Sequence, residues 1–365
     1  MLTRLTIVHL RNLIDVELEG LAQVNLFTGE NGAGKTSLLE ALHLLGAGRS
    51  FRHTQIRPVI HHDADHLLVS CQWLDERGLG HTAGLQRWKD GRVRMRHNGE
   101  SLATVAELAS LFPMQVMNSS SLELVEGSPV QRRQLLDWGL FHVEPGFFPA
   151  WLAAQRALRQ RNALLKHGKM DRQALNLWTH AFVQPSEQVQ KLRQEYFSGF
   201  REQFDRVLSS LDPALASTLQ ISLYPGWGAE HGSLSEALER GLEVDVRRGH
   251  TRFGPHRADM RISCQGRPAH AVLSRGQTKL VAAAMKMAQG SLYSKSTNRP
   301  GIYLVDDLAA ELDERSRRSV AAQLSAQHAQ VFVTAMEAAD LMGCWSESLA
   351  EVALFHVEQG RVSRR

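Results

Sequence analysis

Residues Gly29–Thr36 have the spacing of a phosphate-binding loop: a glycine, four further residues and then Gly-Lys-Thr. The apolar run 24–27 precedes them and helix-forming residues 37–42 follow. Glycines let a backbone curl until its N–H groups face phosphate oxygens, and the start of the next helix adds positive potential. In such a loop Lys35 would reach the β- and γ-phosphates, and the Thr36 hydroxyl would bind Mg²⁺. The pattern predicts an ATP site formed by Gly29, Glu30, Asn31, Gly32, Ala33, Gly34, Lys35, Thr36 and Ser37.

Asp306 and Asp307 follow the apolar run 302–305, where a carboxylate would complete a magnesium site. Two adjacent acids after an apolar strand are unfavourable unless a cation or a catalytic water uses them, although a surface loop also explains them. We assign Asp306 to the metal, directly or through water, and Asp307 to polarising the attacking water, as a catalytic residue together with Lys35. The long separation of Lys35 from Asp306 excludes simple nucleotide kinases and small GTPases and suits a head divided by an insertion.

The elements that must position these residues follow from the apolar patterns. Alternation over 5–8 and 16–18 predicts an antiparallel pair of strands, and turn dipeptides at 90–91 and 98–99 flank another short strand. Strands alternate with helices in the last hundred residues, which predicts a parallel sheet; the expected elements are a helix over 277–288, a strand over 302–305, a helix over 314–327 and a strand over 331–334.

The predicted fold class is therefore α/β: a nucleotide-binding head with a mixed or parallel sheet, formed by residues 1–117 and 250–365, with an inserted, mainly helical lobe over 118–249. The length of 365 residues allows two or three domains at about 100 to 200 residues each. The composition excludes collagen-like, coiled-coil and solenoid proteins. No segment has the pattern of a signal peptide or a membrane span, so we expect a cytoplasmic protein with no membrane partner.

Ser274, Arg275, Gly276 and Gln277 precede and open the predicted helix at 277–288. Ser274 is explained by helix capping alone, but a serine and a glycine at a helix start also form an anion site. The order of motifs resembles the ATP-binding cassette class. The resemblance implies that this signature segment faces the γ-phosphate held by a second copy, so that two copies enclose two ATP molecules. It also implies that Glu311, Leu312 and Asp313 form the crossing D-loop.

Further details resemble the RecF family of bacterial recombination and repair proteins, which is related to the heads of SMC proteins. Transporter subunits of the cassette class usually have a histidine where this chain has Thr334 and Ala335. Like the RecF family, the chain lacks a long coiled coil. The matching segments are Leu10–Asn12, Gly48–Arg52, Gly127–Pro129 with Arg132 and Arg133, Gly254–Arg257, Leu273–Gln277 and Asp306–Asp307.

The resemblance implies a weak, DNA-stimulated ATPase with ATP and Mg²⁺ as cofactors, which dimerises on ATP over DNA at duplex and single-strand gap regions. It implies RecR as a partner, with RecO, RecA loading and SOS induction downstream. Two departures stand out. Ala258 precedes Asp259 where members commonly have an acid directly after Gly254–Arg257, and Asp307 replaces the usual catalytic glutamate. Because Asp307 is one methylene shorter, we predict slow hydrolysis that acts as a release switch.

Two basic patches are candidates for DNA binding. The segment 151–172 has six lysines or arginines against Asp171: Arg156, Arg159, Arg161, Lys166, Lys169 and Arg172. The predicted hairpin has five against Asp90: Arg87, Lys89, Arg92, Arg94 and Arg96. Such rows suit duplex phosphates and predict binding that is independent of sequence and sensitive to salt, although a solvated helix face and a charged strand edge explain them equally well.

Gln115 is a candidate metal- and water-coordinating glutamine, with an exposed polar residue as the alternative. Arg11 and Asn12 are candidates for contact with the adenine or ribose. Two functions from other classes stay open: a nucleotide-gated structural module without functional hydrolysis, and an orphan transporter ATPase. The first would release DNA normally after Asp307→Asn. The second would co-purify with an integral membrane subunit or fail to bind DNA at low salt.

Overall fold

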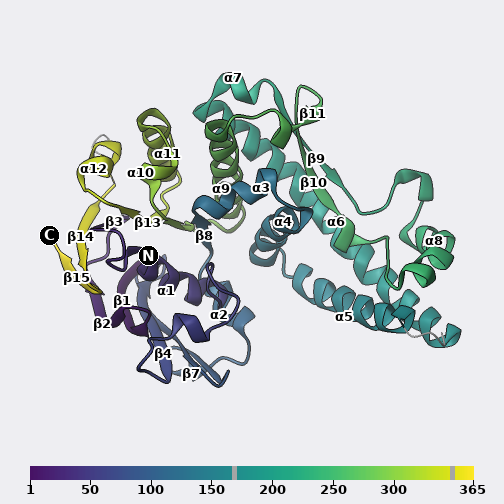
Figure 1. Ribbon diagram of the computed structural model, residues 1–365, viewed down its shortest axis with the longest axis horizontal. Helices are drawn as coiled ribbons and strands as arrows, with labels where there is room; N and C mark the ends of the chain where they lie inside the picture. Colours follow the sequence, from purple (N-terminus) through teal and green to yellow (C-terminus); the bar gives the residue numbers. More distant parts are fainter. Residues whose placement is uncertain (167–170, 346–349) are drawn as a thin grey trace. The chain divides into compact units, whose positions relative to one another are not determined.

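The computed structural model describes residues 1–166, 171–345 and 350–365. It divides into two compact units, one formed by Met1–Ser121 with Lys279–Arg365 and the other by Leu122–Thr278 (Figure 1). The second unit therefore contains residues 250–278, which the sequence patterns assign to the head. The reason is strand pairing: β10 (Asp259–Cys264) pairs antiparallel with β9 (Leu219–Tyr224), so both strands belong to the same unit.

The first unit has two sheets. The strand order β2-β1-β4-β5-β6-β7 forms an antiparallel sheet, in which the predicted pair of N-terminal strands is confirmed. Its strands are β1 (Leu2–Leu10), β2 (Leu13–Glu19), β4 (His66–Leu74), β5 (Gly80–Trp88), β6 (Val93–His97) and β7 (Glu100–Ser101).

The second sheet has the order β15-β14-β3-β13-β12-β8, and all its neighbours are parallel except β14 and β15. All residues of β3 and β12 are buried, as expected for the apolar runs of central parallel strands. The predicted parallel sheet is thus confirmed. Its strands are β3 (Val24–Thr28), β8 (Met114–Met117), β12 (Ile302–Val305), β13 (Gln330–Ala335), β14 (Val352–Glu358) and β15 (Arg361–Arg364).

Helix α1 (Lys35–Ala47) packs against strands of both sheets, which explains why it is buried nearly all round. Parallel strands place their carboxyl ends at one edge, so the loops after β3, β12, β13 and β8 meet there. The other helices of this unit are α2 (Val105–Leu111), α10 (Leu308–Glu311), α11 (Glu314–Ala326) and α12 (Ala339–Trp345), together with most of α9 (Arg275–Thr297).

The second unit is mainly helical, as predicted, and is built around the long helix α6 (Arg172–Leu211). Apolar residues spaced three and four apart along α6, such as Tyr196, Phe200 and Phe204, form its buried face. The small sheet of β9, β10 and β11 (Arg267–Pro268) completes the unit. Its helices are α3 (Glu123–Glu126), α4 (Pro129–Val143), α5 (Phe147–Lys166), α6 (Arg172–Leu211), α7 (Pro213–Ala216) and α8 (Leu234–Arg248).

Candidate functional site

The phosphate-loop sequence forms the turn between β3 and α1. Gly34 has φ 120° and a Cβ there would lie 3.0 Å from Asn12 Nδ2, so both its conformation and its surroundings favour glycine. A Cβ on Gly29 would lie 2.1 Å from the carbonyl oxygen of Val357. The Lys35 ammonium donates hydrogen bonds to the carbonyls of Gly29 at 2.6 Å and Glu30 at 2.9 Å. The loop thus holds its lysine inside its own curve.

Thr36 and Asp306 lie together although they are far apart in the sequence. Thr36 Oγ1 donates a hydrogen bond to Asp306 Oδ1 at 2.9 Å. The buried Thr334, at the end of β13, donates to the same oxygen at 2.8 Å. Hydroxyl and carboxylate oxygens are the ligands that Mg²⁺ prefers, so this pair fits a magnesium ion.

Burial governs the ionisation of these groups. It raises the pKa of Asp306, and the hydrogen bonds from Thr334 and Thr36 oppose that rise. It lowers the pKa of Lys35, whereas the charges of Asp307 and Asp306 oppose that fall. A divalent cation beside Asp306 would favour its ionised form, because an opposite charge stabilises a carboxylate against desolvation.

Asp307 stands between β12 and α10 with φ 53° and ψ 51°, the left-handed region that costs a non-glycine residue about 1–2 kcal/mol. Its N–H donates to Thr334 Oγ1 at 2.8 Å. Thr334 therefore holds both members of the acid pair, one through its proton and the other through its oxygen. In the sequence, Thr334 stands out only because transporter subunits have a histidine there; a polar residue near the end of an apolar strand is the signal that indicates its role.

Arg11 and Asn12, which follow β1, form a second set of contacts with the phosphate loop and with helix α1. Asn12 Nδ2 donates to the Ala33 carbonyl at 3.0 Å, and Ser37 Oγ donates to Asn12 Oδ1 at 3.3 Å. Arg11 forms an ion pair through Nε with the fully buried Glu40 of α1, and its Nη2 donates to Glu40 Oε1 at 2.9 Å. Arg11 and Asn12 thus position the loop and its helix, and a contact of either residue with the adenine or ribose stays a prediction.

Gln115 does not join the candidate metal site. It lies within β8, level with Tyr303 of β12, and only 2% of it is exposed. Its Nε2 donates to Gln289 Oε1 of α9 at 2.7 Å. Strand β8 ends at Met117, whose carbonyl accepts a hydrogen bond from the Asp306 N–H at 2.8 Å. The next residue of the chain, Asn118, therefore lies beside Asp306. We therefore leave Gln115 out of the proposed metal site.

The signature segment and the D-loop both cap helices. Ser274 Oγ accepts from the Gln277 N–H at 3.3 Å and Gln277 Oε1 accepts from the Ser274 N–H at 2.9 Å, so the two form a capping box for α9, with Arg275 and Gly276 between them. Asp313 caps α11 by accepting from Ser316, which lowers the pKa of its carboxyl. In this chain the capping role of Ser274 is present, and a contact with a second copy stays a prediction.

The two basic patches differ in how much charge they present. On β6, Arg94 and Arg96 are exposed, whereas Arg92 pairs with Asp90 at 2.7 Å. On α5, Arg156, Arg159 and Lys166 are exposed. Arg161 is fully buried, so its assignment to a DNA-facing row is wrong. Arg172 is exposed at the start of α6, and Lys169 lies outside the described residues.

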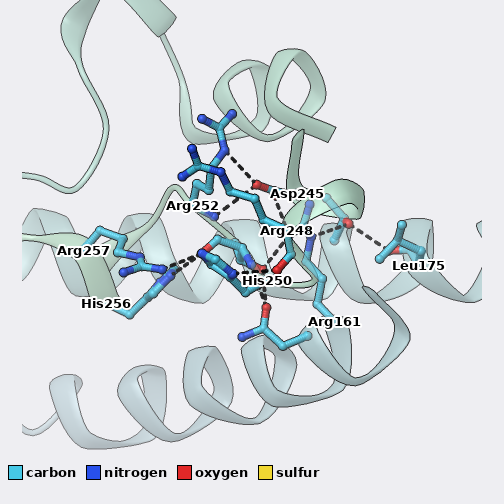
Figure 2. Close-up of polar contacts among 11 residues, drawn as sticks. Arg161, Leu175, Asp245, Arg248, His250, Arg252, His256 and Arg257 are labelled. Atoms are coloured by element: carbon cyan, nitrogen blue, oxygen red, sulfur yellow. Dashed lines mark hydrogen bonds and ion pairs between the residues drawn. The ribbon is translucent and has the colours of Figure 1, made fainter. Parts of the chain in front are cut away.

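Arg161 instead joins the core of the second unit (Figure 2). Its Nη1 donates to Asp245 Oδ2 of α8 at 2.9 Å, and both side chains are fully buried. Arg252 binds the other carboxylate oxygen at 3.3 Å, and Arg161 Nε donates to Thr179 Oγ1 of α6 at 3.0 Å. The network therefore fastens α5, α6 and α8 together.

The segment Gly254–Arg257 is held by arginines of the same unit. Arg193 Nη1 donates to the Pro255 carbonyl at 2.7 Å, and Arg133 Nη1 donates to the Ala258 carbonyl at 2.7 Å. Arg132 forms an ion pair with Asp259 at 2.7 Å. Burial lowers the pKa of His256 to about 4. The ion pair gives Asp259 a structural role, and the contact of His256 Nε2 with the Thr251 carbonyl at 3.1 Å gives His256 one as well.

Comparison with known proteins fits this arrangement. The family model described as "RecF/RecN/SMC N terminal domain" matches residues 1–362. The DNA replication and repair protein RecF of Azotobacter vinelandii is 43% identical over 363 residues, which cover 100% of this chain and 98% of the relative. The protein of the same name from Pseudomonas putida is 41% identical, with 100% of this chain and 98% of the relative covered.

Solved structures show the same fold. The recombination mediator protein RecF-ATPrS in the RecFOR pathway has a TM-score of 0.87 at 23% identity and covers 100% of this chain and 98% of its own. An SMC head bound to the C-winged helix domain of ScpA has a TM-score of 0.59 at 16% identity, covering 100% and 96%. The predicted fold class, a cassette-type ATPase head with a helical insertion, is confirmed. The chain belongs to the RecF family of DNA replication and repair proteins.

Proposed function

We propose that this protein is an ATP-dependent DNA-binding switch of recombinational repair and replication restart. The observation that carries the proposal is the meeting of Thr36 and Asp306, whose side-chain oxygens lie 2.9 Å apart beside a complete phosphate loop. Relatives of the same family have been solved with names that specify RecF-ATP and RecF-ATPrS. The nucleotide is therefore ATP, with Mg²⁺ held by Thr36 and Asp306.

The residues of the site divide the work. The loop N–H groups and Lys35 bind the phosphates, and Lys35 exchanges the carbonyls of Gly29 and Glu30 for phosphate oxygens. When bound, Mg²⁺ neutralises charge on the phosphates. Asp307 orients and polarises the attacking water, and its short side chain makes hydrolysis slow. The enzyme is a weak, DNA-stimulated ATPase whose slow turnover sets the lifetime of the bound state.

ATP also completes a homodimer. Ser274 and Gly276 open α9 at an anion-binding helix start, and in the dimer they meet the γ-phosphate held by the second copy. Asp313 lies in the segment that crosses between the two copies. Dimerisation on ATP places the basic residues of two chains against one DNA. This arrangement supports sequence-independent binding at duplex and single-strand gap regions.

The biological setting follows from the family and its pathway name, RecFOR. We infer that the DNA-bound dimer acts beside the chromosome in the cytoplasm, with RecR as its direct partner. RecO and RecA act downstream of RecR, so that dimerisation on DNA supports RecA loading and SOS induction. No helix within the described ranges 1–166, 171–345 and 350–365 is long and apolar enough to cross a membrane.

Analytical ultracentrifugation with and without ATP and DNA tests the proposal. Lys35→Met should abolish nucleotide binding and leave a monomer. Ser274→Asp keeps a good helix cap but places a negative charge against the γ-phosphate, so it should bind ATP and fail to dimerise. Ser274→Thr, which keeps the hydroxyl, is the matched control and should dimerise. Dimerisation of Ser274→Asp at the concentration required by the parent would contradict the proposed arrangement.

A further inference from the structure

A turn in the head places several histidines together, away from the nucleotide site. Residues His61, His62 and Asp63 follow a short stretch that is hydrogen-bonded to the end of β1. The His61 carbonyl accepts a hydrogen bond from the Ala64 N–H at 3.1 Å, which closes the turn that contains His61, His62 and Asp63. None of these residues takes part in the nucleotide site described above.

The donor atoms are already close. One side-chain ligand atom from each of His61, His62 and Asp63 lies within 4.8 Å of the others, and no other such group of three was found among the described residues. His62 Nε2 and Asp63 Oδ2 are 3.0 Å apart, and each side chain is 80% exposed. In a tetrahedral zinc site with bonds of about 2.0–2.2 Å, the ligands lie roughly 3.3 Å apart. Small rotations of exposed side chains would bring the three donors to that spacing.

The backbone under the cluster is firmly placed. The His61 N–H donates to the His9 carbonyl at 2.8 Å, and the Arg11 N–H donates to the Val59 carbonyl at 2.9 Å. The His61 ring packs edge-on against His9, with ring centres 6.5 Å apart, and stacks on His62 at 4.3 Å. One donor is thus held in place while two exposed donors remain adjustable, an arrangement that lowers the entropy lost on binding.

Two histidine nitrogens at this turn lack a hydrogen-bond partner among the described residues. Nδ1 of His9 and Nδ1 of His61 are buried and have no hydrogen-bond partner within the described part of the chain.

From this cluster we infer that His61, His62 and Asp63 form a binding site for a divalent transition-metal ion, for which Zn²⁺ is the probe. Two imidazoles and one carboxylate are a donor set found for zinc, with water in the fourth position. Magnesium prefers oxygen ligands and retains its own waters, so it does not compete here. The site is separate from the proposed Mg²⁺ ligands Thr36 and Asp306. The zinc proposal therefore does not depend on the proposed ATP-dependent switch.

Zinc titration of the full-length, untagged protein tests the inference. The protein is stripped of metal and titrated with Zn²⁺ against a chromophoric chelator. The parent should bind one Zn²⁺ more than His62→Ala at micromolar free zinc, and the affinity of that site should fall at least tenfold in His62→Ala and Asp63→Ala. Counting the difference between proteins is necessary because the chain has 17 histidines and 3 cysteines that can bind zinc weakly.

Matched controls separate the site from general histidine binding. His53→Ala and His270→Ala remove exposed histidines elsewhere and should bind zinc as the parent does. Asp63→Glu, which keeps an oxygen donor, should retain more affinity than Asp63→Ala. Because His62 and Asp63 are exposed, their variants should fold normally by circular dichroism. Identical zinc isotherms for the parent, His62→Ala and Asp63→Ala would overturn the inference.

Discussion

Thr334 Oγ1 donates a hydrogen bond to Asp306 Oδ1 at 2.8 Å, and Thr334 Oγ1 also accepts a hydrogen bond from the N–H of Asp307 at 2.8 Å. One hydroxyl thus orients both acids of the candidate catalytic pair. In this position a side chain that both donates and accepts is required, which a threonine supplies and a valine of similar shape does not.

Replacing Thr334 with valine should weaken metal-dependent activity while leaving the fold intact. A hydrogen bond to a charged group contributes about 1.5–3 kcal/mol, so we expect the Mg²⁺ concentration for half-maximal ATPase activity to rise about tenfold or more. Thr334→Ser retains the hydroxyl and should behave like the parent. Magnesium titration of ATP hydrolysis measures the effect; equal magnesium requirements in valine and serine variants would contradict the role of Thr334.

Asp307→Asn should remove the proposed base without removing nucleotide binding. General-base catalysis contributes about 10²- to 10⁴-fold, so the turnover should fall by that factor while ATP affinity and ATP-dependent dimerisation stay near those of the parent. DNA release after ATP addition should slow in parallel. Normal release kinetics in this variant would favour the nucleotide-gated structural module, in which hydrolysis has no part.

The two basic patches should contribute separately to DNA binding. We expect Arg94→Gln with Arg96→Gln, or Arg156→Gln with Arg159→Gln and Lys166→Gln, to lower the slope of log affinity against log salt by about 0.9 per lost phosphate contact. Fluorescence anisotropy with duplex and gapped DNA over a range of salt measures this. Arg267→Gln, at another exposed position, is the control. A patch whose neutralisation leaves the slope unchanged is a solvated face and not a DNA contact.

Arg161→Met should destabilise the second unit, because it leaves Asp245 buried without its main partner. Removing one member of a buried ion pair typically costs about 3–5 kcal/mol. Arg161→Met combined with Asp245→Leu should recover much of the loss, and Arg159→Ala on the exposed face should have little effect. Thermal and urea unfolding of the three variants gives the comparison; a stable Arg161→Met would show that the ion pair is dispensable.

His256 should make stability depend on acid. Its pKa is about 4 in the folded protein and about 6.5 when unfolded, so the unfolded state binds the proton more readily. Stability is therefore full above pH 6.5 and falls by up to about 3 kcal/mol as the pH drops toward 4. His256→Gln can still donate to the Thr251 carbonyl and should flatten this slope. Urea unfolding between pH 4 and 7 checks it, with His53→Gln as the exposed control.

The phosphate loop and the acid pair could be predicted because each is a local pattern at the end of an apolar strand. Gln115 and Arg161 show where such patterns stop. Gln115 lies two residues before the end of β8, so its side chain is inside the sheet and not at the edge where Asp306 lies. No sequence pattern marks the last residue of β8. Arg161 lies about 200° around the helix from Arg159, so the helical period already indicates that the two side chains lie on opposite faces. Its partner Asp245 is 84 residues away, and only the tertiary structure brings the two together.

The hydrogen bonds of Lys35 to the carbonyls of Gly29 and Glu30 have a consequence for how the loop fills. The ammonium is held against the loop by these two carbonyl oxygens, which occupy the hydrogen-bonding positions that phosphate oxygens would take. An arriving triphosphate then trades one set of oxygens for another around a fixed cation, and no segment has to fold first. Nucleotide capture should accordingly be fast and insensitive to viscosity-dependent loop rearrangement, leaving the slower steps to subunit pairing.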